Sequence, residues 1–295
     1  DTAKAAFMNG LKVYRFAERN NPPANTFTNL TGSDVNTIHA NDFKFYEELN
    51  DVIQREPSEV FSPELLGMAS AIGIQKGKPF KPSKEQKALL TEAVAIGNAT
   101  ARSILFAPQD PKAYIYPGKA GYWQTGFPGG NHDYVVNGGK GGRDMDGRTL
   151  FFYLATVNTP AMVLELPGVG SQYAFSSRDS SGAYLDGSKT YKLNIPANPP
   201  AKRFWSFVVY DPQTRSMLQS KEMPYPSKNN KRNPEMAKNA DGSIDLYFGP
   251  EAPAGKEANW VKTVPGKGWF GIFRLYGPGQ EWFDRSWKLG AIEKT

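Results

Sequence analysis

The chain has few side chains that could carry acid–base or metal chemistry. His39 and His132 are its two imidazoles, and it contains no cysteine. Disulfides, thiolate zinc sites, iron–sulfur clusters and a cysteine nucleophile are therefore excluded within this chain. His39 stands just ahead of a predicted helix, and we interpret it as an interior or capping residue. With only two imidazoles, a histidine-rich metal centre is unsupported.

One glycine-rich loop gathers cation-binding residue types. His132, Asp144 and Asp146 supply a nitrogen and oxygens, and Asp144-Met145-Asp146-Gly147 resembles the start of a calcium loop. The later acidic ligand of a complete EF-hand is missing. A solvated loop is the favoured alternative, so His132, Asp144 and Asp146 are only candidate metal ligands. No other cofactor is predicted.

Hydrolase signatures are weak. The Gly-x-Ser-x-Gly pattern of a nucleophile elbow is absent. Ser206 follows Trp205 inside a predicted strand, where alternation places the two side chains on opposite faces, and we interpret its hydroxyl as structural. Glu165, Asp186 and Asp211 qualify for carboxylate-pair glycoside cleavage by residue type alone, because sequence does not reveal their separation.

Aromatic side chains provide another kind of candidate, a concave face for an apolar or sugar-like ligand. Core packing would use the same residues and is the favoured alternative. Arg274 lies in an otherwise apolar strand, so if buried it needs a carboxylate or a ligand anion. Asp186 or Asp211 is the expected ion-pair partner. The predicted ligand-binding residues are Trp205, Tyr210, Arg274, Tyr276, Trp260 and Asp186.

Composition favours β structure and argues against two classes of partner. The 295 residues include 29 Gly and 23 Pro, and 13% are aromatic, which favours turns and sheet. The net charge of 35 − 29 = +6 is spread along the chain, and no nucleic-acid-binding signature accompanies it. No apolar stretch reaches the ~20 residues needed to cross a bilayer. We therefore predict neither a nucleic-acid partner nor a transmembrane segment.

Hydrophobic periodicity predicts helices first and strands afterwards. Leu11–Phe16 alternates as a half-buried strand does. Three helices are then predicted. The first covers Phe43–Gln54, the second starts at the N-cap Ser62 with Pro63 and stops at Gly73, and the third runs from Ser83 to before Pro108. Beyond Pro108, glycine- and proline-rich loops separate short aromatic and β-branched runs. The predicted strands are Thr149–Thr156, Tyr173–Ser176, Thr190–Ile195, Phe204–Tyr210, Ile244–Phe248 and Trp269–Leu275.

The predicted fold class is mainly β with a helical segment: an antiparallel jelly-roll-like β-sandwich preceded by about three α-helices. We divide the chain into 1–35, the last strands of an N-terminal β domain, then 36–108, a helical connector, and 109–295, the sandwich domain. This division rests partly on a resemblance to a known family.

Several ordered runs in the second half carry that resemblance, among them Leu185–Tyr191, Phe204–Asp211, Asn239–Ser243 and Phe273–Pro278. They resemble a bacterial pair of domains of unknown function, twelve-fifty-four followed by twelve-fourteen. The resemblance implies an N-terminal β domain, a helical connector and a C-terminal jelly-roll-like domain, often with a secretion signal. It implies no agreed activity.

The chain also departs from this family. The body of the N-terminal domain, with its Asn-Asp-Thr-rich motif, is not present. The loop Met217–Arg232 reads Met-Pro-Tyr-Pro where family members have an Asn-Arg-Tyr-like run. We expect the preceding portion either to be retained as a separate bound fragment or to have left an exposed apolar edge.

Three functions remain open at this point. The first is a secreted or periplasmic protein that binds or processes a small apolar or sugar-like ligand. The second is a structural or assembly module that acts through protein–protein interfaces, including a homo-oligomer. The third is a metal-dependent hydrolase. Whether the protein is an enzyme is left undecided.

Overall fold

The computed structural model describes residues 2–30, 38–155 and 157–295. The chain forms two compact units, Asp1–Ile38 and His39–Thr295. The predicted domain boundaries at residues 35 and 108 stay predictions, and the first lies outside the described residues. Within the described residues, no helix is both long and apolar enough to cross a membrane.

The first unit contains the helix α1 (Thr2–Gly10) and the 3₁₀ turn η1 (Phe16–Glu18). The predicted strand at Leu11–Phe16 is wrong, because residues 2–30 form no strand. The Asn25 side chain instead accepts a hydrogen bond from the Val13 N–H at 3.2 Å and donates one to the Leu11 carbonyl at 2.7 Å. A side chain thus satisfies the backbone groups that a neighbouring strand would have paired.

The second unit begins with the three predicted helices, which are confirmed as α2 (Lys44–Arg55), α3 (Pro63–Ala71) and α4 (Lys84–Phe106). Ser62 Oγ and Ser83 Oγ accept the capping bonds of α3 and α4 at 3.3 and 3.2 Å. The Gln86 side chain donates to the Ile72 carbonyl at 2.8 Å, so only half of a capping box forms. The helices share an apolar cluster of Tyr46, Ile53, Ala69, Ile74 and Leu90.

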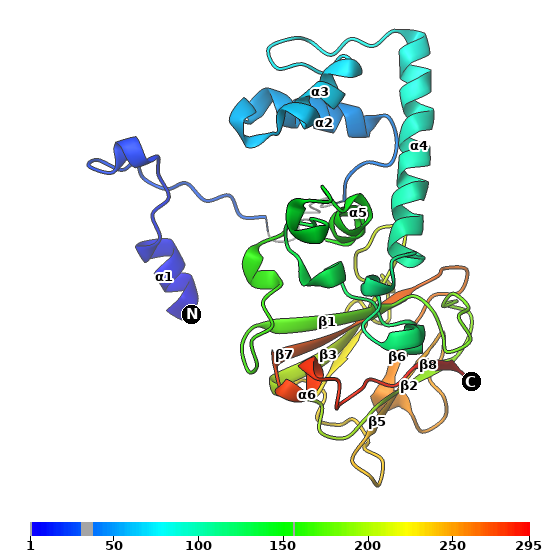
Figure 1. Ribbon diagram of the computed structural model, residues 1–295. Helices are drawn as coiled ribbons and strands as arrows, with labels where there is room; N and C mark the ends of the chain where they lie inside the picture. The colour runs from blue at the N-terminus through cyan, green and yellow to red at the C-terminus, as the bar shows by residue number, and fades with distance from the viewer. Residues whose placement is uncertain (1, 31–37, 156) are drawn as a thin grey trace. The chain divides into compact units, whose positions relative to one another are not determined.

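The sandwich consists of two four-stranded sheets (Figure 1). The first has the order β1 (Ser171–Ser176), β7 (Phe270–Pro278), β3 (Ala201–Tyr210) and β4 (Ser227–Asn229). The second has the order β6 (Trp260–Lys262), β5 (Ile244–Gly249), β2 (Tyr191–Ile195) and β8 (Ile292–Lys294). Every pair of neighbouring strands is antiparallel except β5 and β6, which are parallel. The chain passes repeatedly between the sheets, so the predicted fold class is confirmed.

One predicted strand of this region is a helix. Residues Met145–Leu154 form α5, whereas a strand was predicted over Thr149–Thr156. The Asp144 carboxylate accepts a hydrogen bond from the Gly147 N–H at 2.8 Å and caps the first turn. Helical spacing then buries Leu150 and Tyr153 together, which outweighs the strand preference of this aromatic run. Thr156 itself lies outside the described residues.

Short helical segments fill several of the connections. They are η2 (Ser58–Val60), η3 (Pro111–Ala113), η4 (Pro117–Tyr122), η5 (Pro128–Gly130), η6 (Asn137–Gly139), η7 (Pro160–Met162), η8 (Glu257–Asn259) and α6 (Gln280–Phe283).

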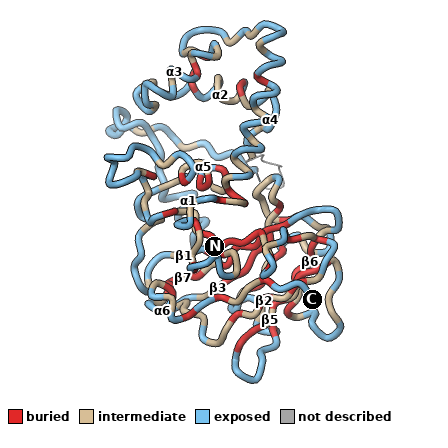
Figure 2. Tube along the Cα trace, turned by 45° about the vertical axis from the view of Figure 1, so that its right-hand side comes forward, coloured by how far each residue is buried: buried red, intermediate tan, exposed pale blue. Residues whose placement is uncertain are grey.

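Alternation along the strands gives the first sheet two different faces. On β7, Phe273 and Leu275 point into the main core, where the two sheets meet and Phe207 lies 4.9 Å from Phe248 between ring centroids. A Cβ atom on Gly271 would clash with the Phe207 ring, so only glycine fits there. Figure 2 shows the buried residues running along the strands of both sheets.

The outer face of the first sheet packs against helices. Phe270 and Ile272 of β7 and Phe175 of β1 form a second cluster with Leu105 at the end of α4 and Leu150 of α5. Leu105 and Phe175 are 0% and 1% exposed, so this layer is closed at its centre. Farther along the same face it opens into a cleft.

Candidate ligand-binding cleft

A cleft of about 330 Å³ lies on the outer face of the first sheet, beneath α5. We call it the Arg274 cleft. Its floor comes from β1, β3 and β7, and its walls come from α5, the 125–127 segment and η7. Its lining residues are Thr125, Gly126, Phe127, Phe151, Leu154, Ala155, Met162, Ser171, Gln172, Tyr173, Phe175, Tyr210, Arg215, Phe270, Ile272 and Arg274.

Arg274 occupies the floor of this cleft without an acidic partner. It lies on β7, one of the two inner strands of the sheet, with Tyr173 of β1 as a register partner. Its Nη2 donates to the Tyr210 hydroxyl, and the rings of Tyr173 and Tyr210 lie 5.5 and 5.7 Å from its guanidinium carbon. Its buried Nε has no hydrogen-bond partner in the described part of the chain. The guanidinium is therefore oriented by aromatic rings and keeps donors to spare.

The ion pairs expected for Arg274 do not form. Asp186 Oδ2 lies 3.2 Å from Lys189 Nζ, and Asp211 Oδ2 lies 2.7 Å from Lys267 Nζ. Within the described residues, no carboxylate oxygen lies within 4.0 Å of the Arg274 guanidinium. Both aspartates pair instead with lysines near their own turns.

A second cation, Arg215, borders the cleft. Its Nε donates to the Tyr153 carbonyl at 3.0 Å, its Nη1 donates to the Gln213 carbonyl at 2.6 Å, and its guanidinium stacks 4.1 Å above the Tyr153 ring. Its Nη2 lies 3.4 Å from Nδ1 of His39. Burial is the main cause that lowers the pKa of Arg215, and none of its described partners is a carboxylate in ion-pair contact.

The electrostatics of the cleft follow from this lining, which contains two arginines and no Asp or Glu. Burial raises the pKa of the Tyr210 phenol above its usual 10.0, so the phenol stays protonated near neutral pH. Weakly hydrated surroundings strengthen an interaction between a guanidinium and an anion. The cleft can accordingly hold an apolar group and bind one negative charge.

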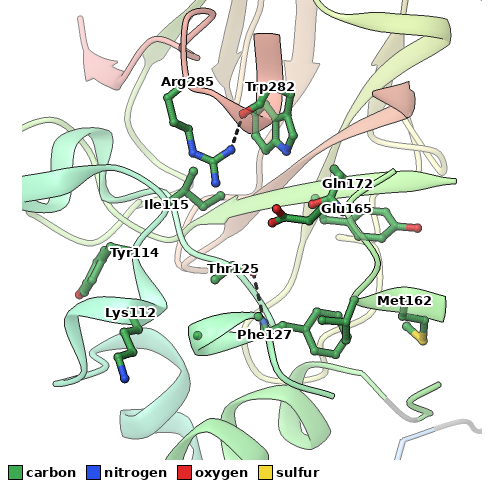
Figure 3. A pocket seen from close by; sticks show the side chains of 14 residues that line it. Lys112, Tyr114, Ile115, Thr125, Phe127, Met162, Glu165, Gln172, Trp282 and Arg285 are labelled. Carbon is green, nitrogen blue, oxygen red and sulfur yellow. Dashed lines mark hydrogen bonds between the residues drawn. The ribbon is translucent and has the colours of Figure 1, made fainter. Parts of the chain in front are cut away.

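A smaller pocket of about 170 Å³ adjoins the cleft (Figure 3). The two cavities share Thr125, Phe127, Met162, Gln172 and Tyr173 in their linings. The Glu165 carboxylate points into the smaller pocket, while Arg285 donates to the Trp282 carbonyl (Figure 3). The Phe127 N–H donates to Thr125 Oγ1 at 3.2 Å and stabilises the wall between the cavities. This pocket is the more polar neighbour of the cleft.

The structure brings only part of the predicted ligand site together. Tyr210 and Arg274 meet in the cleft, and Tyr276 lies on the same face of β7, stacked 4.1 Å from Phe204. Trp205 is 2% exposed and belongs to the main core. Trp260 donates from Nε1 to the Gly249 carbonyl at 3.0 Å in the second sheet. Trp205 and Trp260 therefore do not line the cleft.

Asp186 also lies away from the cleft, in the turn before β2. It accepts hydrogen bonds from the Ser188 N–H at 2.9 Å and from Ser188 Oγ at 2.6 Å. The Ser188 bonds, with a smaller contribution from Lys189, lower the pKa of Asp186 to about 2. This carboxylate stabilises a turn and is a poor proton donor.

The candidate metal ligands are not assembled into a centre. Asp144 caps α5, and His132 Nε2 lies 3.4 Å from the neighbouring Asp133 carboxylate. Across residues 2–30, 38–155 and 157–295, no three His, Asp or Glu side chains lie close enough together to hold a metal ion. His132, Asp144 and Asp146 thus remain a sequence prediction that this geometry does not support.

Several lining residues were not predicted, notably Arg215, Phe151, Met162 and Gln172. Phe151 was assigned to a strand, and Arg215 stands in a loop that sequence gives no reason to place beside β7. One usable signal was present: Phe270, Ile272, Arg274 and Tyr276 recur with a period of two and therefore share one face.

Comparison with known proteins extends the assignment of the sandwich. Residues 170–280 match the family described as Protein of unknown function (DUF1214). The resemblance predicted for the C-terminal part is thus confirmed there. The partner domain, twelve-fifty-four, stays a prediction. No curated protein matches the chain.

Two solved structures are similar in part. The crystal structure of the VPA0106 protein from Vibrio parahaemolyticus is 19% identical, with a TM-score of 0.41, over 93% of this chain and 58% of that one. An uncharacterised protein from Burkholderia cenocepacia is 16% identical, with a TM-score of 0.32, over 79% of this chain and 48% of that one. The chain thus spans about half the length of these two proteins.

Proposed function

We propose that the protein binds a small apolar ligand carrying one anionic group, a carboxylate in the simplest case, in the Arg274 cleft. The observation that carries this proposal is Arg274 itself, an arginine on the floor of a largely apolar cleft, with spare donors and no acidic partner in the described chain. A partly buried charge without a counter-ion is costly, and a ligand anion would offset that cost.

The walls of the cleft favour an apolar ligand over a sugar. Phe127, Phe151, Met162, Phe270 and Ile272 all line it. A sugar needs several hydrogen-bonding groups around it, whereas most of this lining is aromatic or aliphatic. The volume of about 330 Å³ lies at the small end of the usual range for ligand pockets, roughly 300–1,000 Å³. A secreted or periplasmic location is also our proposal, and it rests on the family resemblance.

The polar groups define how the ligand would lie. Arg274 would bind the anion mainly through Nη1, since Nη2 already donates to Tyr210 and the buried Nε–H lies on the opposite edge of the guanidinium. Tyr173 and Tyr210 would hold the guanidinium plane, and Arg215 would add positive potential from the side of α5. The apolar body would then extend past Phe127 and Met162, the residues shared with the smaller pocket.

Calorimetric titration with octanoate and with 1-octanol tests the proposal. Octanoate should bind the wild-type protein, and octanol, which has the same chain without the charge, should bind more weakly. Arg274→Gln should weaken octanoate binding on the order of tenfold or more, because a hydrogen bond to a charged group contributes about 1.5–3 kcal/mol.

Arg285→Gln is the matched control. It removes a guanidinium from the adjoining pocket and leaves the Arg274 cleft intact. Octanoate binding should therefore be preserved in this variant. Equal affinity for octanoate and octanol, or no loss on Arg274→Gln, would show that the arginine does not select an anion.

A further inference from the structure

A third cavity, separate from the Arg274 cleft and from its smaller neighbour, lies between the C-terminal half of α4 and the edge of the sandwich. It encloses about 470 Å³, and its lining shares no residue with that of the cleft. We call it the Trp269 groove. Its lining residues are Ala99, Arg102, Ser103, Phe106, Ser177, Tyr184, Leu185, Pro212, Gln213, Gly268 and Trp269.

Three residues that line this groove each carry an unpartnered polar atom. Five buried side-chain nitrogen or oxygen atoms in the described chain lack a hydrogen-bond partner, and three of them belong to groove residues: Trp269 Nε1, Ser177 Oγ and Arg102 Nε. Trp269 is 2% exposed and Ser177 is 4% exposed. Buried polar groups are normally satisfied, so a cluster of three requires an explanation.

All three of these groups are hydrogen-bond donors. An indole N–H and a guanidinium N–H can only donate, and a serine hydroxyl can donate as well. The groove lining contains no Asp or Glu that could accept from them. What each of the three groups lacks is a hydrogen-bond acceptor, and an oxyanion such as a carboxylate or a phosphate offers several.

Arg102 is held in a way that suits this role. Its Nη2 donates to Asn98 Oδ1 at 3.0 Å, one turn earlier on α4, and this fixes the side chain without neutralising it. Tyr153 Oη also donates to Asn98 Oδ1, at 3.4 Å. The charge of Arg102 also acts on Arg215. Burial is the main cause that lowers the pKa of Arg215, and the Arg102 cation lowers it further. Within the described residues, no Asp or Glu forms an ion pair with Arg102.

We propose that the Trp269 groove binds a small oxyanion, the carboxylate or phosphate group of a small molecule, through Trp269, Ser177 and Arg102. Each of the three unpartnered atoms has less than 1 Å² of accessible surface. Binding therefore involves a small outward shift of the Arg102 side chain, which is only partly buried. The site is independent of the ligand proposed for the Arg274 cleft.

Nuclear magnetic resonance of the indole N–H groups tests this site directly. The chain has six tryptophans and so six indole signals, and Trp269→Phe identifies the one from Trp269. The uniformly ¹⁵N-labelled protein is titrated with sodium acetate and with sodium phosphate at constant ionic strength, set with sodium chloride. The Trp269 signal should shift saturably with at least one anion while the others stay in place. The anion that is effective distinguishes a carboxylate site from a phosphate site.

Variants separate the groove from the cleft. Arg102→Gln should abolish the saturable shift, and Arg274→Gln should leave it unchanged. Arg55→Gln, which removes an exposed arginine paired with Asp51 on α2, is the matched control and should also leave it unchanged. A missing shift with both anions, or a shift that survives Arg102→Gln, would overturn the proposal.

Stability measurements give a second, independent readout. Because Ser177 Oγ has no partner in the unliganded protein, Ser177→Ala should leave the melting temperature unchanged or raise it in sodium chloride. The same variant should weaken the anion-dependent shift of the Trp269 signal. A clear loss of stability on Ser177→Ala would mean that the hydroxyl has a structural partner, such as a buried water, and would argue against an anion site.

Discussion

The two faces of the first sheet differ sharply, although the same strands supply both. On the inner face, Phe273 and Leu275 of β7 are completely buried among aromatic rings of both sheets. On the outer face, Ile272 and Arg274 of the same strand line a cleft. Adjacent residues of β7 thus lie in different surroundings: the inner ones build the core, and the outer ones line the cleft that we propose as a binding site.

The difference shows where this fold can accommodate function. A closed core tolerates neither a cavity nor an unpaired charge, because both carry a large free-energy cost. The outer layer is formed by α5 and by loops that are not tied to the strand register, so it can leave space above β7. The cleft lies where the regular sheet meets its irregular cover.

The largest expected effect is on the inner face. Phe273→Ala should lower the free energy of unfolding by about 3–5 kcal/mol, because it leaves a cavity among tightly packed rings. Phe273 lies 5.8 Å from Trp205 and 5.9 Å from Trp287 between ring centroids. Urea denaturation followed by tryptophan fluorescence measures the change. A loss below 1 kcal/mol would break the comparison, because the inner face would then be as tolerant as the outer one.

A smaller effect is expected one position along β7. Arg274→Met keeps a long side chain and removes an unpaired charge, so the free energy of unfolding should stay within about 1 kcal/mol of wild type or rise. Octanoate binding should be lost in the same variant. Urea denaturation and calorimetric titration with octanoate, done on one preparation of Arg274→Met, measure stability and binding together. A destabilisation near that of Phe273→Ala would assign Arg274 a structural role.

The sandwich was predictable from sequence because alternation is local. The runs at Thr190–Ile195 and Ile244–Phe248 have the period of two that half-buried strands require, and both form strands. The aromatic run after Asp144 also favours a strand, by its composition. Its helical state is decided by a cap and by packing on α4, which no short window of sequence contains.

The cleft was predictable only in part, for a related reason. Arg274 attracted attention because a charge in an apolar strand needs a partner, and it does line a cavity. Trp205 and Tyr210 are five residues apart on β3 and so lie on opposite faces, yet aromatic residues of both faces were assigned to the site, and Trp205 lies in the core. Arg215 reaches the cleft through a loop, and its position depends on how α5 packs above the sheet.

The smallest expected effect concerns the cover of the outer face, where His39 contacts Arg215 and packs against Tyr153 and Phe45. Burial, followed by the Arg215 charge, lowers the pKa of His39 below its usual 6.5, and Glu48 opposes this shift. As the pH falls through 6.5, His39 takes up a proton more readily in the unfolded chain than in the folded chain. Protonation therefore favours the unfolded state, and the free energy of unfolding decreases towards low pH. His39→Gln should therefore make the fall in stability between pH 7.5 and 5 shallower, by less than about 1 kcal/mol, because the ring is partly exposed and solvent screens it. Urea denaturation at several pH values measures this, and parallel pH profiles for wild type and variant would show that the cover of the outer face does not respond to His39 at all.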